Sequence, residues 1–166
     1  LDEMLQALEE SLAGLTEHQL WFEGPEKRNR IGSIVMHVHE NIDRHACYLQ
    51  TGEFALEHED RFDFYGRPAL RFRPEAGLPT VADLQRRQAM LKAAVFAGLE
   101  AAASDAELLT PRFAAGEYWW REHGRKSLDA YLRVIAHGNA HIRQIWLLRG
   151  RIGAWDDETF PGQFYH

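Results

Sequence analysis

The sequence predicts an all-α protein, a four-helix bundle with a long crossover between its second and third helices. In four stretches of the chain, apolar residues recur at the helical steps of three and four. Between the second and third stretches, about 25 residues rich in aromatic residues and proline form an unusually long connection. The length of 166 residues with 45% apolar content suits a single domain, 1–166, with one core.

A stripe of leucines predicts the first helix, because steps of four, three, four and three separate Leu1, Leu5, Leu8, Leu12 and Leu15. Gly14 is expected to mark its end. Thr16 and Gln19 have the spacing of a capping box, which predicts a short extra turn towards Trp21. The Gly24-Pro25 pair then predicts a break in the chain.

The other three helices follow from the same spacing, and their expected ranges are 31–50, 80–104 and 127–150. Gly52 is the expected stop of the second helix, since glycine accepts the left-handed conformation in which helices commonly end. Thr80 and Asp83 form a plausible cap at the start of the third helix.

The fourth helix carries two histidines, His137 and His141, four residues apart. Residues with this spacing share one helix face, about 6 Å apart along the axis, so that both imidazoles can reach a single metal ion. Such pairs also occur as ordinary interface or surface residues. If both rings are buried, a metal, a carboxylate or water must satisfy them, since an unsatisfied buried group costs about 1–3 kcal/mol.

Three histidines of the second helix, His37, His39 and His45, compete to provide a third ligand. At 100° per residue, His45 falls within about 20° of Val38, the centre of the apolar stripe, whereas His37 lies about 100° away. Periodicity therefore favours His45. A histidine at the centre of a stripe is, however, more often a hydrogen-bonded core residue, while one at the edge can line an open pocket, and the spacing leaves the three open.

Several blocks of the chain resemble the DinB-like family of four-helix proteins, which includes thiol-dependent S-transferases and the mycothiol-dependent maleylpyruvate isomerase domain. The most specific block is His137-Gly-Asn-Ala-His-Ile-Arg-Gln-Ile145, because the family carries a paired histidine followed by glutamine and an aliphatic residue there. The weaker blocks are Ala13-Gly-Leu-Thr-Glu-His-Gln-Leu20, Ile31-Gly-Ser-Ile-Val-Met-His-Val38 and Leu147-Leu-Arg-Gly150.

In that family one histidine from the second helix and two from the fourth hold the metal. The resemblance therefore implies that His37, His137 and His141 bind a divalent ion, for which zinc, nickel and iron(II) are all suitable. The segment from Tyr118 to Gly124 has no counterpart in the family pattern, and substrate choice is expected to reside there. The family's long crossover agrees with the connection expected above.

The resemblance implies a metal-dependent enzyme of the S-transferase type, in which a low-molecular-weight thiol attacks a small electrophile. One alternative is a metal-dependent hydrolase with Glu40 or Asp43 as its base. Another is a non-enzymatic metal-binding stress-response protein whose ion only stabilises the fold. Cys47 is expected opposite the core side of its helix, with no activating partner and no catalytic role.

Composition limits the partners of the chain. A net charge of −6 argues against nucleic acid, whose binding depends on phosphate neutralisation, and leaves a small-molecule substrate. No apolar run approaches the roughly 18 residues of a membrane span. The single cysteine allows no internal disulfide and suits a cytoplasmic protein. Many DinB-like relatives are homodimers, so a homodimer is an expectation here too.

Overall fold

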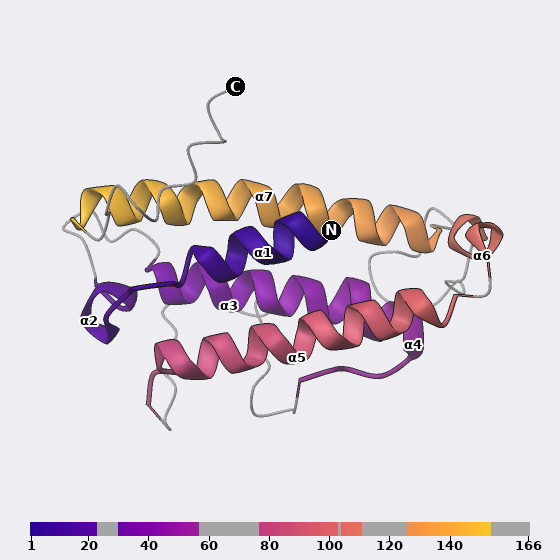
Figure 1. Cartoon of the computed structure of the whole chain (residues 1–166), viewed down its shortest axis with the longest axis horizontal. Coiled ribbons are helices and arrows are strands. Elements are labelled where there is room, and N and C mark those ends of the chain that lie inside the picture. Colours follow the sequence, from indigo (N-terminus) through magenta and orange to yellow (C-terminus); the bar gives the residue numbers. More distant parts are fainter. Residues whose placement is uncertain (23–29, 57–76, 103, 111–125, 154–166) are drawn as a thin grey trace, which may run out of the picture.

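A computed structural model of the chain describes residues 1–22, 30–56, 77–102, 104–110 and 126–153 (Figure 1). Every secondary-structure element in these ranges is helical, which confirms the all-α class. In chain order the elements are α1 (Asp2–Glu10), α2 (Glu17–Leu20), α3 (Ile31–Ile42), the π-helical turn η1 (Asp43–Tyr48), α4 (Leu49–Thr51), α5 (Val81–Glu100), α6 (Asp105–Leu109) and α7 (Ser127–Arg151).

Local capping signals in the sequence set several helix ends. Thr16 accepts a hydrogen bond from the Gln19 amide at 3.2 Å, and the Gln19 side chain accepts one from the Thr16 amide at 2.9 Å. Thr80 and Asp83 form the same reciprocal pair at the start of α5. Gly52 ends α4 with a φ of 83°, in the left-handed region that glycine adopts without strain. These predicted starts and stops are confirmed.

The longer helices pack around one apolar core. Helices α1 and α3 each contact both α5 and α7. In Figure 1, α3 and α5 run in the same direction, while α1 and α7 run in the opposite one. A connection that returns along the bundle must therefore link α4 to α5. Most of that connection, residues 57–76, lies outside the described residues, so the crossover of the DinB-like fold stays a prediction.

The second predicted helix is not uniform, because its last part is the π-helical turn η1. Such a turn changes the α-helical spacing of side chains, and both α5 and α7 contact η1. Cys47 is consequently in the core with 3% of its surface exposed, and its expected position away from the core is wrong. Burial, reinforced by the Asp43 carboxylate, raises the pKa of the Cys47 thiol to about 12, so it stays protonated at neutral pH.

Two tertiary contacts hold the ends of these helices. Gly32 lets the indole of Trp21 pack against the start of α3, where an added Cβ would lie only 2.6 Å from a ring carbon. At the other end of the chain, the buried guanidinium of Arg149 donates to the carbonyls of Ser11 and Ala13, at 3.1 and 2.7 Å. Carbonyls that follow the end of α1 are thereby satisfied.

Within the described part of the chain, no helix combines the length and the apolar character that crossing a membrane requires.

Candidate metal centre

Three histidines from two helices converge in the structure. His37 lies on α3, and His137 and His141 lie on the neighbouring helix α7. One ring nitrogen of each lies within 4.8 Å of the other two, and the Nε2 atoms of His37 and His137 are 2.8 Å apart. The ring centroid of His141 is 4.9 Å from that of His37 and 4.4 Å from that of His137. The structure thus brings together the three residues that the family resemblance singles out.

Local spacing and tertiary packing both contribute to this convergence. The four-residue interval on α7 places His137 and His141 on one face. His37 reaches them because α3 packs against α7. In α3, every residue from Ile31 to Ile42 is buried except His37, which is partly exposed. His137 and His141 are partly exposed as well, so all three histidines of the group can be reached from solvent.

The surroundings keep the rings of His37 and His137 neutral. Burial, reinforced by the neighbouring His137 and His141, lowers the pKa of His37 from 6.5 to about 3. Burial, followed by His141 and Arg133, lowers the pKa of His137 to about 4. Neutral imidazole is the form that ligates metals. Between the Nε2 atoms of His37 and His137, one ring donates a hydrogen bond to the other, and a metal ion would take the place of that proton.

Gln144 orients the third histidine. Its side-chain oxygen accepts a hydrogen bond from His141 Nδ1 at 2.8 Å, one turn further along α7. A proton held on Nδ1 leaves the lone pair on Nε2, so this contact selects the tautomer that can ligate. Gln144 belongs to the motif quoted above, but spacing alone gave it no role. The signal that could have identified it is a hydrogen-bonding residue three positions after a candidate ligand.

The competing histidines of the second predicted helix do not join this group. His39 and His45 have 2% and 0% of their surfaces exposed. His45 is a core residue, as its place at the centre of the apolar stripe indicates. Among the described residues, only the three converging histidines are close enough to share an ion. His39 instead faces Gln88 of α5, and burial is the main cause that lowers its pKa to about 3.

The two carboxylates considered as bases differ in position. Asp43 is buried and accepts hydrogen bonds from the backbone amides of Ala55 and Leu56, at 2.6 and 3.4 Å. It anchors the segment that follows α4, which is a structural role. The Glu40 carboxylate lies 2.9 Å from the guanidinium of Arg44, one turn along the same helix.

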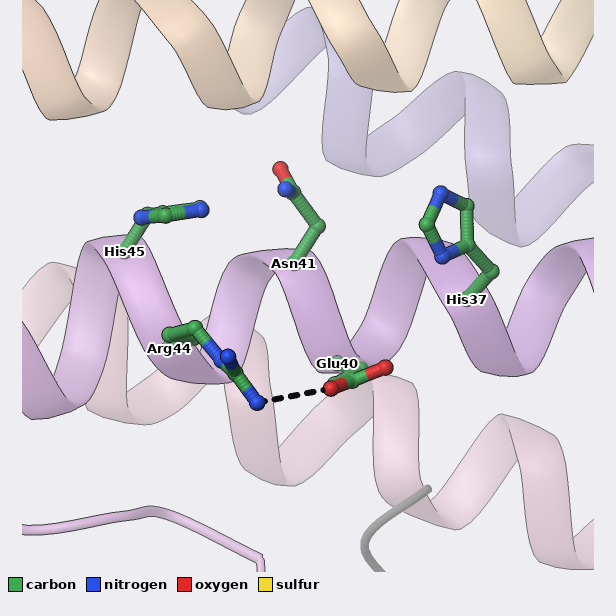
Figure 2. Close-up of a pocket in the computed structure, with 5 residues that line it drawn as sticks. All are labelled: His37, Glu40, Asn41, Arg44 and His45. Carbon is green, nitrogen blue, oxygen red and sulfur yellow. Dashed lines mark hydrogen bonds and ion pairs between the residues drawn. The ribbon is translucent and has the colours of Figure 1, made fainter. Parts of the chain in front are cut away.

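Glu40 also lines a pocket that includes one of the three converging histidines (Figure 2). The pocket is a narrow hollow, and its lining residues are His37, Glu40, Asn41, Arg44 and His45. A polar hollow thus lies directly beside the candidate metal centre.

The segment from Tyr118 to Gly124, where substrate choice was expected, lies outside the described residues. Comparison of the chain with family models, with curated proteins and with solved structures finds no match.

Proposed function

We propose that His37, His137 and His141 bind one divalent metal ion, with zinc, nickel and iron(II) as candidates, in an enzyme of the S-transferase type. The observation that carries the proposal is the placement of three ring nitrogens, from two helices, within 4.8 Å of one another. Three histidines are a ligand set that leaves a coordination position open in catalytic sites. The partial exposure of His37 gives small molecules access to that position.

An ion in this site would act as a Lewis acid that lowers the pKa of a bound thiol. The residues of the chain have separate tasks around it. The three imidazoles hold the ion, and Gln144 keeps His141 in the tautomer that can ligate. The partly buried surroundings of the rings reduce their contact with bulk water, which strengthens electrostatic interactions at the site.

Membership of the DinB-like family is part of this proposal. Its support is the histidine and glutamine pattern of α7 together with the shared direction of α3 and α5, which a crossover between them requires. The reaction that we propose joins a low-molecular-weight thiol to a small electrophile.

The first test is elemental analysis of the purified, tag-free protein beside a His37→Ala, His137→Ala, His141→Ala triple variant. We expect about one metal ion per chain in the parent protein and none in the variant. His18→Ala is the matched control, because His18 is an exposed histidine on α2 and should not change the metal content. Absence of metal from the parent protein, even after incubation with zinc and nickel salts, would overturn the proposal.

The second test addresses the reaction. The metal-loaded protein is mixed with a chromogenic aryl halide and a panel of small thiols, and consumption of both reactants is followed. We expect thioether formation that depends on the metal and on the thiol. Metal binding without turnover of any pair would instead support a non-enzymatic metal-binding protein.

A metal-dependent hydrolase is the second candidate, and the position of Glu40 favours it. The carboxylate lines the same pocket as His37, so it could serve as a base for water. Ester hydrolysis that needs no thiol and is lost in Glu40→Gln would decide for this candidate.

A further inference from the structure

Gly138 lies on α7 between the two histidines that this helix contributes to the candidate metal centre. It is buried, and its backbone is helical, so no left-handed φ requires glycine at this position. Glycine is the poorest helix former apart from proline. A glycine in the middle of a 25-residue helix therefore weakens that helix, and the close approach of a neighbouring helix is the reason that the structure offers for it.

The neighbouring helix is α1, whose Met4 lies across the backbone of α7 at Gly138. A Cβ added to Gly138 would lie 2.5 Å from the sulfur of Met4, 3.1 Å from its Cγ and 3.3 Å from its Cε. The contact thus involves most of the methionine side chain and not only its flexible end. Met4 has 2% of its surface exposed and belongs to the close-packed apolar core. A methyl group at position 138 would consequently move α1 and α7 apart or rotate α7 about its axis.

Such a movement would reach the candidate metal centre. Gly138 directly follows His137 and precedes His141 by three residues, so all three belong to the same turn of α7. Besides α1, α7 contacts α3, which carries His37. Across that second contact, the Nε2 atoms of His37 and His137 are 2.8 Å apart. Metal-ligand distances have to be met within about 0.2 Å. A small displacement of α7 would therefore misplace two of the three ligands at once.

We propose that Gly138 is a positioning residue of the candidate metal centre. By admitting Met4 against the backbone of α7, it sets the position from which α7 presents its two histidines to His37. The inference rests on the proposed function, since it assumes that the three histidines hold an ion. A helix that supplies none of these histidines, α1, thereby takes part in the geometry of the centre.

The test measures zinc affinity by competition with a chromogenic chelator. Gly138→Ala should weaken zinc binding by about 10-fold or more, the range found when a group that orients a ligand is lost. Met4→Ala should have a much smaller effect, because it removes bulk from the contact and adds none. The double variant Met4→Ala, Gly138→Ala should bind zinc as tightly as Met4→Ala alone, because the new methyl group then occupies space that the thioether has left.

Gly98→Ala is the matched control, because Gly98 is also a helical glycine, on α5. A Cβ added there would lie 3.8 Å from the Tyr131 hydroxyl and 4.0 Å from the Thr51 methyl group, which are ordinary van der Waals distances. The zinc affinity of this variant should equal that of the parent protein.

A second readout distinguishes positioning from a general loss of stability. The absorption spectrum of the cobalt(II)-loaded protein depends on the number and the geometry of the ligands. We expect it to change in Gly138→Ala and to return to the parent spectrum in the double variant. A merely structural role for Gly138 would lower the free energy of unfolding of the metal-free protein, but the zinc affinity and the cobalt spectrum of the folded protein would stay the same.

The outcomes separate this inference from the function on which it rests. If the parent protein and Gly138→Ala bind zinc equally, the positioning inference is wrong while the metal site stands. If the parent protein binds neither zinc nor cobalt, both are wrong. If Gly138→Ala does not fold, the double variant decides: an affinity equal to that of Met4→Ala supports the inference, and a loss that persists without the Met4 thioether overturns it.

Discussion

His37 and His39 are two residues apart on α3, and the pKa of each is lowered to about 3. Burial is the main cause in both cases. His37 nevertheless meets two other histidines, whereas His39 meets Gln88, whose side chain in turn donates to the carbonyl of Leu5. A lowered pKa therefore marks a buried histidine without saying what it does. The convergence of several ring nitrogens is what distinguishes the candidate metal centre.

The difference between the two residues has a simple geometric cause. Side chains two positions apart on an α-helix point about 200° away from each other. His37 therefore faces α7, which carries His137 and His141, while His39 faces α5, which carries Gln88. Both neighbours pack against a buried or half-buried imidazole, but only α7 offers further metal ligands.

The largest expected effect comes from substituting one histidine of the candidate metal centre and, for comparison, His39. His137→Ala should lower metal affinity by more than about 100-fold, because loss of an outer partner of a ligand alone costs about 10–100-fold. His39→Gln, which keeps a hydrogen-bonding group next to Gln88, should leave the affinity within about threefold of the parent value, since single-site effects of this kind stay local. Competition with a chromogenic chelator measures both. Equal losses in the two variants would show that His39 contributes to metal binding as much as His137 does.

The next effect should come from Gln144, which is hydrogen-bonded to a candidate ligand, whereas Gln88 lies beside a histidine outside the candidate metal centre. Gln144→Leu removes the acceptor of the His141 Nδ1 proton, and metal affinity should fall by about 10–100-fold. Gln144→Glu retains an acceptor and should keep most of the affinity. The same chelator competition measures both variants, and an unchanged affinity in Gln144→Leu would show that His141 needs no orienting partner.

Acid should destabilise the metal-free protein through His39. The unfolded chain takes up the proton near pH 6.5, but the folded chain does so only near pH 3, so lowering the pH below 6.5 favours unfolding. Between pH 7.5 and pH 5, this one residue should lower the free energy of unfolding by about 2 kcal/mol. Urea titrations at the two pH values measure the change. In His39→Gln the loss should be smaller by that amount, and an identical loss would show that other groups carry it.

The smallest effect is expected from removal of a ligand in the metal-free protein. His141→Ala should keep the helix content and change the free energy of unfolding by less than about 1 kcal/mol, since the apolar core does not depend on this partly exposed ring. Circular dichroism and urea unfolding measure both quantities. Global unfolding of the variant would instead assign the histidine a structural role and weaken the contrast with His39.

Elements that depend on short-range signals could be predicted from the sequence. The capping pairs Thr16 with Gln19 and Thr80 with Asp83 act within four residues, so their residue types already determine the helix starts. The stop at Gly52 is local in the same way. The turn η1 and the short helix α6 were not predicted, because a π-helical turn and a five-residue helix leave no periodic pattern to detect.

The candidate site also has a part that short-range sequence signals predict and a part that they do not. His137 and His141 were identified from their spacing, and the family resemblance added His37. Periodicity favoured His45 over His37, but α3 is buried on almost every side, so no single apolar stripe singles out one face. The role of Gln144 and the grouping of Glu40, Asn41 and Arg44 into one pocket also became visible only in the folded chain.

The sequence by itself determined the helical class, most helix ends and the pair of histidines on the last helix, because each of these depends on residues within a few turns of one another. The tertiary structure alone decided that His37 joins that pair while His39 packs against α5. The physical reason is that helix packing selects which of several buried faces meets which neighbour. That choice is made by contacts between residues about 100 positions apart in the chain.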